Sequence, residues 1–256
     1  MTIRAPRRLA RLWLIRARGA VQTAALVGLT APWLASGAAQ AAEGVVSAEY
    51  GGETTRYAHG VLGDAIEYGS LTVVTDRGRR LRIVLPEHSV FEDLAPRVVD
   101  LDGDGAAEVV VVESHRDLGG QLAVYGPEGK IAATPHIGRT NRWLAPIGAA
   151  DFDGDGAMEI GYIDRPHLAK TLLLWRYEDR ALTWVAALPG MTNHRIGEDF
   201  ISGGIRDCAG PLEMVVAEAN WSGTVAVRFT AGQLSRAELP YPATPSGFAD
   251  ALSCAP

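Results

Sequence analysis

The nonapeptide pattern D-x-D-G-D-G-x-x-E occurs twice in this chain and constrains its fold more than any other feature. It runs from Asp100 to Glu108 and again, 51 residues later, from Asp151 to Glu159, each time between apolar runs. Carboxylates at alternate positions of a tight loop converge on one point, and the intervening glycines let the backbone curl without steric strain. Two such loops in register predict a repeated cation-binding connection set into β-structure.

We expect calcium at both loops, because this hard cation prefers roughly six to eight oxygen ligands. Four carboxylates within nine residues would repel one another without a cation; an acidic turn that holds no ion is the alternative. An EF-hand is excluded, since position 12 is Val111 or Tyr162 and the flanks are β-like. The expected ligands are Asp100, Asp102, Asp104, Ala106 and Glu108 in the first loop, and Asp151, Asp153, Asp155, Ala157 and Glu159 in the second.

A short apolar strand recurs along the chain and sets the length of the repeat. Its marker residues are Leu71, Leu122, Leu172 and Val225, at spacings of 51, 50 and 53. Each unit reads as strand, acidic loop, strand, loop, marker strand, turn and strand. Four short antiparallel strands per unit of about 50 residues are typical of propeller blades. The sequence therefore predicts an all-β fold, a small β-propeller of about four blades.

The ends of the repeat predict how the ring closes. Arg56–Gly63 is expected to be the second strand of the first blade, and Phe248–Leu252 a final strand that completes that blade's sheet. Such closure removes exposed sheet edges. A five-bladed ring, with Val45–Tyr50 as part of another blade, is the alternative. Cys208 and Cys254 occupy matching positions in neighbouring units and are predicted to form a disulfide that fastens the closure; two free thiols are the alternative.

The first 41 residues have the three parts of a secretory signal peptide. Six arginines lie within residues 4–18, an uncharged apolar stretch follows, and Ala39-Gln40-Ala41 ends it with small residues. Cleavage near Ala41 would leave residues 42–256 as a single periplasmic or secreted domain. An uncleaved membrane anchor is the alternative, because the apolar stretch is long enough to span a bilayer.

Charge narrows the range of partners. Removing residues 1–41 takes away six arginines and no acidic residue, so the formal charge moves from −6 to −12. Nucleic acid is excluded, because binding to phosphates needs a basic footprint. We also expect no stable membrane insertion of the mature chain.

The strand–DxDGDGxxE–strand unit resembles the FG-GAP, or VCBS, repeat of integrin-α-like β-propellers. The resemblance covers the chain from about Arg56 to the C-terminus and is carried by the two intact acidic loops. It implies calcium loops with a structural role, on a propeller that binds proteins or carbohydrates. At the third equivalent position, residues 204–213, aspartates are lost and Arg206 has entered, so no ion is expected there.

The polar loops opposite the acidic ones are the expected ligand face. Arg142 and Arg195 fall at matching repeat positions and are predicted to clamp a carboxylate, phosphate or sulfate. Internal ion pairs that only hold the loops are the alternative for these side chains. The full set of candidate ligand-binding residues is Arg142, Asn193, His194, Arg195 and Trp221.

The sequence contains no G-x-S-x-G elbow, H-E-x-x-H helix or Cys/His zinc spacing. It therefore predicts an exported, calcium-binding β-propeller that acts as a non-catalytic binding module. The expected partner is an unidentified protein, a carbohydrate or a small anionic ligand. The alternative is a periplasmic metal-dependent hydrolase or lyase that uses the polar loop face.

Overall fold

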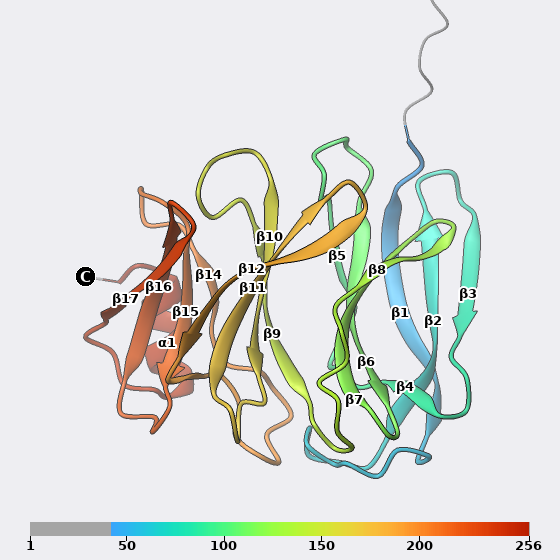
Figure 1. The fold of residues 1–256 in the computed structure, drawn as a ribbon, viewed down its shortest axis with the longest axis horizontal. Helices are drawn as coiled ribbons and strands as arrows, with labels where there is room; N and C mark the ends of the chain where they lie inside the picture. Colours follow the sequence, from blue (N-terminus) through green and yellow to red (C-terminus); the bar gives the residue numbers. More distant parts are fainter. Residues whose placement is uncertain (1–41, 256) are drawn as a thin grey trace, which may run out of the picture. The chain divides into compact units, whose positions relative to one another are not determined.

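The computed structural model describes residues 42–255, which belong to one compact unit of antiparallel sheets (Figure 1). The predicted signal peptide, residues 1–41, and its cleavage point lie outside the described residues. Between residues 42 and 255 the chain forms no helix with the length and apolar character needed to cross a membrane.

The secondary structure of the described part is almost entirely β, as the repeat predicts. The elements are β1 (Val45–Thr54), β2 (Glu67–Thr75), β3 (Arg80–Val84), β4 (Ser89–Phe91), β5 (Arg97–Val99), β6 (Glu108–His115), β7 (Gly119–Gly126), β8 (Gly129–Ala133), β9 (Leu144–Ala150), β10 (Met158–Asp164), β11 (Thr171–Glu178), β12 (Ala181–Pro189), β13 (Met191–Thr192), β14 (Gly204–Arg206), β15 (Glu213–Glu218), β16 (Thr224–Thr230), β17 (Gln233–Glu238) and α1 (Pro245–Leu252).

These strands form three antiparallel sheets, the first of which folds back on itself. Its order is β1-β2-β4-β6-β7-β8, and β2 meets β4 only through the pair Tyr68 and Phe91. The bend at β4 separates β1–β3 from β5–β8. We call β1–β3 layer 1, β5–β8 layer 2, β9–β12 layer 3 and β14–β17 layer 4. The layers follow one another in chain order (Figure 1).

Apolar clusters fill the space between successive layers. Val109 and Val111 of β6 pack toward layer 1, whereas Val110 and Val112 of the same strand pack toward layer 3. Successive side chains of a strand point to opposite faces, so a strand covered on both sides is apolar throughout. The uninterrupted run of valines in β6 is the result, and a third cluster joins layers 3 and 4 in the same way.

The predicted closing strand Phe248–Leu252 is wrong, because these residues form the helix α1. Thr244 caps the helix: its hydroxyl accepts a hydrogen bond from Gly247 N–H at 3.2 Å, and Pro245 follows in the first turn. Phe248 and Ala251 then pack on layer 4. Helix α1 therefore packs against layer 4, whereas the prediction placed these residues in the sheet of the first blade. Propeller closure is not detected among residues 42–255.

Two further strand assignments differ from the prediction. Arg56–Gly63 is a loop, and β1 takes the place beside β2 instead. Because Val45–Tyr50 lies within β1, it does not form a fifth blade. In layer 4 the strand that leads into the corresponding loop is β14, since Gly204–Arg206 pairs with β15.

Candidate metal centres

The first acidic loop joins β5 to β6 and is held by its own carboxylates. Asp100 accepts hydrogen bonds from the backbone N–H groups of Gly103 at 2.8 Å and Gly105 at 3.0 Å. Asp104 accepts one from the N–H of Ala106 at 2.7 Å. Both glycines have positive φ angles, 72° and 87°, which residues with a Cβ rarely adopt. The loop therefore curls tightly enough to bring its acidic side chains together.

Three carboxylates of this loop converge. Asp100, Asp102 and Glu108 each offer an oxygen, and the three oxygens lie within 4.8 Å of one another. Glu108 is buried and its Oε2 accepts a hydrogen bond from Leu101 N–H at 3.0 Å. Burial raises the pKa of Glu108 to about 7, and the charges of Asp102, Asp104 and Asp100 add to the increase. An all-carboxylate donor set of this kind suits a hard divalent cation.

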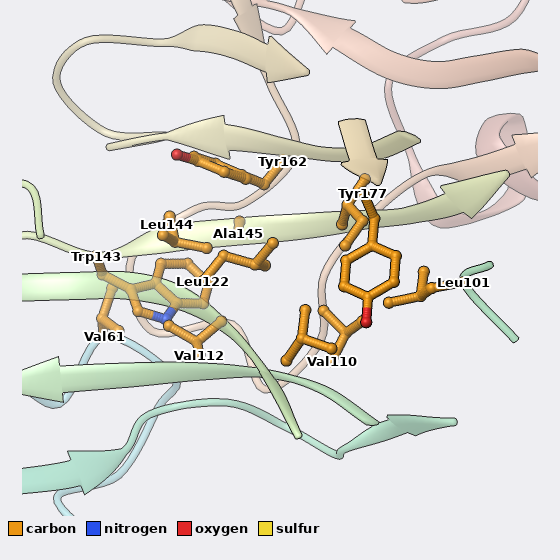
Figure 2. Close-up of a cluster of buried hydrophobic side chains, with 12 residues drawn as sticks. Val61, Leu101, Val110, Val112, Leu122, Trp143, Leu144, Ala145, Tyr162 and Tyr177 are labelled. Atoms are coloured by element: carbon orange, nitrogen blue, oxygen red, sulfur yellow. The ribbon is translucent and has the colours of Figure 1, made fainter. Parts of the chain in front are cut away.

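A tyrosine from the next layer faces the first loop. Tyr177 on β11 is 2% exposed, and within residues 42–255 its hydroxyl has no hydrogen-bond partner. Figure 2 shows its ring beside Leu101 of the loop. Burial raises the pKa of Tyr177 to about 12, and the nearby Glu108 and Asp102 carboxylates add to the increase. An unpartnered buried hydroxyl costs about 1–3 kcal/mol, and the charges that act on this one include Glu108, Asp102 and Asp104 of the loop. The residues of the first loop therefore fit a cation.

The second acidic loop, between β9 and β10, repeats the backbone pattern of the first. Asp151 accepts hydrogen bonds from Gly154 N–H at 2.7 Å and Gly156 N–H at 2.9 Å. Glu159 accepts one from Phe152 N–H at 3.1 Å, as Glu108 does in the first loop. Oxygens of Asp151, Asp153 and Glu159 again lie within 4.8 Å of one another. By the geometry of its carboxylates, this loop also qualifies as a candidate metal centre.

A guanidinium distinguishes the second loop from the first. Arg176 on β11 lies opposite Glu159 in the register and contacts its Oε1 at 2.5 Å. The same guanidinium lies 2.8 Å from Asp155 and 3.2 Å from Asp153. Burial alone would lower the pKa of Arg176, but hydrogen bonding and charge from Glu159 raise it above its ordinary value. The carboxylates of the second loop thus already have a positive partner within the chain.

At the first loop, the position equivalent to Arg176 carries no cationic side chain. Continuing the β6–β7 register from the pair Val109 and Tyr125 places Gly126 opposite Glu108. The residue that faces each loop from the next layer also differs, since Phe229 takes at the second loop the place that Tyr177 has at the first. Among the described residues, the first loop therefore has an acidic cluster with no ion-pair partner and faces a hydroxyl with no hydrogen-bond partner, whereas the second has an ion pair and an apolar ring.

In layer 4 the corresponding loop has lost its acidic cluster. Glu213 remains, but Arg206 contacts it at 2.6 Å and Arg228 contacts its other oxygen. Cys208 and Cys254 form the predicted disulfide, with their Cα atoms 5.8 Å apart. It joins this loop to the end of α1 rather than to a closing strand.

The predicted ligand residues occupy different environments. Asn193 and His194 are buried, and the Asn193 side chain donates to Ala145 O at 3.3 Å. The Arg195 guanidinium lies 3.7 Å from the ring centre of Trp221 and pairs with Glu198. Arg142 instead lines a separate cavity, which Arg195 does not line. The structure therefore does not bring the two arginines together in one pocket.

The protein consists of layers of antiparallel strands, and in two layers an acidic loop joins two paired strands. This arrangement defines the class of protein: a β-repeat protein with candidate cation-binding loops. Comparison with protein families agrees, because residues 100–162 match the model of the FG-GAP-like repeat. The matched segment begins at the first acidic loop and includes the second. No curated protein matches the chain.

Sequence reasoning missed the two side chains that make the loops unequal. Arg176 and Tyr177 directly follow the apolar run Leu172–Trp175 of the third marker strand, and the repeat pattern gives neither of them a role. One signal was available, because Arg228 stands 52 residues after Arg176, in the same place of the next unit. A basic side chain opposite the last glutamate of an acidic loop indicates that an ion pair can take the place of a metal ion there.

Proposed function

We propose that this protein is an exported FG-GAP-type binding module whose first acidic loop binds calcium as a structural ion. The observation that carries the proposal is the convergence of Asp100, Asp102 and Glu108 beside the unpartnered hydroxyl of Tyr177. The donors are oxygens alone, which suits calcium and not the transition metals that prefer imidazole or thiolate. When bound, the ion would offset the repulsion among carboxylates that β5 and β6 bring together.

The second loop binds calcium in this proposal only when Arg176 withdraws. Its guanidinium already contacts Asp153, Asp155 and Glu159, so an ion would compete with three contacts inside the chain. The two loops therefore differ in calcium affinity, although their sequence patterns are the same.

Export and a non-catalytic role complete the proposal. The disulfide between Cys208 and Cys254 is typical of an oxidising compartment, which supports cleavage near Ala41 and a periplasmic or secreted location. A partner would bind at the loops on the side opposite the acidic loops. These opposite loops lie along the lower edge of Figure 1. A protein, a carbohydrate or a small anion remains the expected partner. N-terminal sequencing of the protein recovered from outside the cytoplasm tests the cleavage point.

Thermal unfolding tests the calcium site. A ligand that binds only the folded state stabilises it by about 2.7 kcal/mol at a hundredfold excess over its dissociation constant. We expect the melting temperature to fall in EDTA, and to return with calcium more than with magnesium. Asp102→Asn should remove most of this response, whereas Asp117→Asn, an exposed acid outside the loops, should keep it. An unchanged melting temperature in EDTA would contradict the proposal.

The competing function, a metal-dependent hydrolase or lyase, predicts a different result. Turnover of a phosphate or acetate ester of p-nitrophenol, lost in an Arg142→Ala/Arg195→Ala double variant while the fold persists, would overturn the non-catalytic role. We expect no metal-dependent turnover of either ester.

A further inference from the structure

A cavity of about 250 Å³ lies among the loops on the side away from the acidic centres. Its walls come from four connections: the loop after β1, the loop before β9, the loop after β10 and the loop before β14. The residues that matter to its chemistry are His59, Arg142, Trp143, His167, Leu168 and Ile196. The cavity thus draws on segments from three layers that are far apart in the sequence.

One wall is a histidine held by a buried carboxylate. The Nδ1 atom of His59 lies 2.5 Å from Oε1 of Glu92, whose residue is fully buried. Ser114 donates to the other oxygen of Glu92, and the indole N–H of Trp143 donates to the Glu92 carbonyl at 2.8 Å. With Nδ1 held by the Glu92 carboxyl group, Nε2 is the ring nitrogen of His59 left for another partner. The pair also fixes the ring of His59 at the cavity wall.

The tautomer of a second imidazole, that of His167, is fixed by two successive hydrogen bonds. Nε2 of His194 lies 2.9 Å from the carbonyl of Glu198, which can only accept, so this nitrogen carries the proton. Nδ1 of His194 then accepts from Nε2 of His167 at 3.0 Å. The remaining nitrogen of His167, Nδ1, is an acceptor. Burial, together with nearby His194, lowers the pKa of His167 to about 4, so the ring is neutral at pH 7.

Three further residues that line the cavity are cationic or apolar. Within residues 42–255 the Arg142 guanidinium bonds to the carbonyls of Asn141 and Thr140 in its own turn, at 2.8 and 3.5 Å, and to no other group. It therefore keeps donors for a planar anion. Leu168 and Ile196 are 63% and 73% exposed although both line the cavity. Large apolar side chains so exposed at a concave site are a common feature of ligand pockets.

We propose that this cavity binds a small carboxylate with an apolar body and a hydroxyl group at its far end. The carboxylate would accept from Arg142, the body would cover Leu168 and Ile196, and the hydroxyl would donate to Nδ1 of His167. The inference deepens the binding role proposed above by giving the ligand class, and it needs no calcium ion. The charge of the ligand agrees with the predicted preference for a small anion, but the site is built from Arg142 without Arg195.

Calorimetric titration with 4-hydroxybenzoate tests the proposal, with two probes that each lack one feature. Benzoate lacks the hydroxyl donor, and 4-hydroxybenzyl alcohol lacks the charge. We expect 4-hydroxybenzoate to bind with a dissociation constant in the millimolar range or tighter, which is about the weakest affinity for a specific small ligand that calorimetry resolves. Both partial probes should bind at least several-fold more weakly. Equal binding of all three, or no binding of 4-hydroxybenzoate, would overturn the proposal.

Variants assign the contacts. Arg142→Gln should weaken 4-hydroxybenzoate about tenfold or more, the usual effect of losing a charged hydrogen bond. Arg139→Gln is the matched control, since Arg139 is an exposed arginine of the same loop outside the cavity. His167→Phe should make 4-hydroxybenzoate and benzoate bind alike. If Arg142→Gln binds like the wild type, the site is not the one described. A calcium response in unfolding with no probe binding would refute this inference alone.

Discussion

Replacing Arg176 with glutamine is the sharpest test of the difference between the two acidic loops. The change removes a guanidinium that contacts three carboxylates, at 2.5 Å from Glu159, 2.8 Å from Asp155 and 3.2 Å from Asp153. Glutamine keeps much of the length and polarity of the side chain. Without the cation, the second loop has the same unpaired acidic cluster as the first. We therefore expect it to become a calcium site.

The structure gives the size of the effect in the absence of calcium. Removing one partner of a buried ion pair costs about 3–5 kcal/mol, and a fully exposed pair costs less than about 1 kcal/mol. Glu159 is fully buried, whereas the Arg176 side chain is 24% exposed. A loss of about 2–3 kcal/mol lies between these limits. For a domain of roughly 200 residues it lowers the melting temperature by about 4–12 °C.

Two measurements follow this change. Isothermal titration should find one calcium site in the wild type at micromolar protein and two in Arg176→Gln. Melting curves should show the variant below the wild type in EDTA, with most of the difference recovered in excess calcium. The recovery follows because an ion that binds only the folded state stabilises it in proportion to the logarithm of its concentration.

Arg228→Gln is the control, because Arg228 has the equivalent place in layer 4. It contacts Glu213, but that loop has no cluster of three carboxylates among the described residues. This variant should lose stability without gaining any response to calcium. Two equal calcium sites in the wild type, or an Arg176→Gln protein with no added site, would refute the reasoning.

Three other measurements test the packing. Replacing both Cys208 and Cys254 with alanine should lower stability by about 4 kcal/mol by chain entropy for a 46-residue separation, seen as a lower midpoint in urea; an unchanged midpoint would contradict it. Glu67 is buried, and burial raises its pKa to about 9 from a usual 4.5. The folded state therefore holds a proton that the unfolded state releases, so stability should fall as pH rises between about 4.5 and 9, by up to about 1.4 kcal/mol per unit. Glu67→Gln should flatten this part of the pH profile, and an equally steep profile would refute the assignment. Phe248→Ala should cost about 3–4 kcal/mol by chemical unfolding, because the ring is buried between α1 and layer 4; a loss under about 1 kcal/mol would show that α1 is dispensable.

The repeat could be predicted from the sequence because each unit carries the same local chemistry. The marker residues Leu71, Leu122, Leu172 and Val225 all lie within strands and are all fully buried. Acidic loops and glycine turns mark the connections between strands, where side-chain and backbone hydrogen bonds act over a few residues. Local signals of this kind are legible in one sequence, and the antiparallel all-β fold is confirmed.

The closure could not be predicted in the same way. Phe248–Leu252 matches the apolar character of a strand, and the ring model left one place to fill. The competing signal is Thr244 followed by Pro245, a pair that is typical of a helix N-terminus. The position of β1 was missed for a related reason. Whether an edge is filled by Val45–Thr54 or by Arg56–Gly63 depends on tertiary pairing that neither segment encodes alone.

The candidate centres show the same limit at the level of side chains. The carboxylates that converge were predicted from their spacing, because they lie in one loop. Arg176 and Tyr177 come from strands and layers whose register is fixed only by folding. The cavity with His59 and His167 was missed for the same reason, since its histidines lie 108 residues apart in the sequence.

The loops that join paired strands in layers 2, 3 and 4 show how one structural task is met by three chemistries. The first would be tightened by an ion from solution, the second by the fixed charge of Arg176, and the third by the bond from Cys208 to Cys254. A chelator would remove the ion from the first loop, and high ionic strength would weaken the ion pairs of the second. A reductant would break the disulfide of the third. If the first loop binds calcium as proposed, the stability of the chain depends on calcium, salt and redox conditions together, each through a different loop.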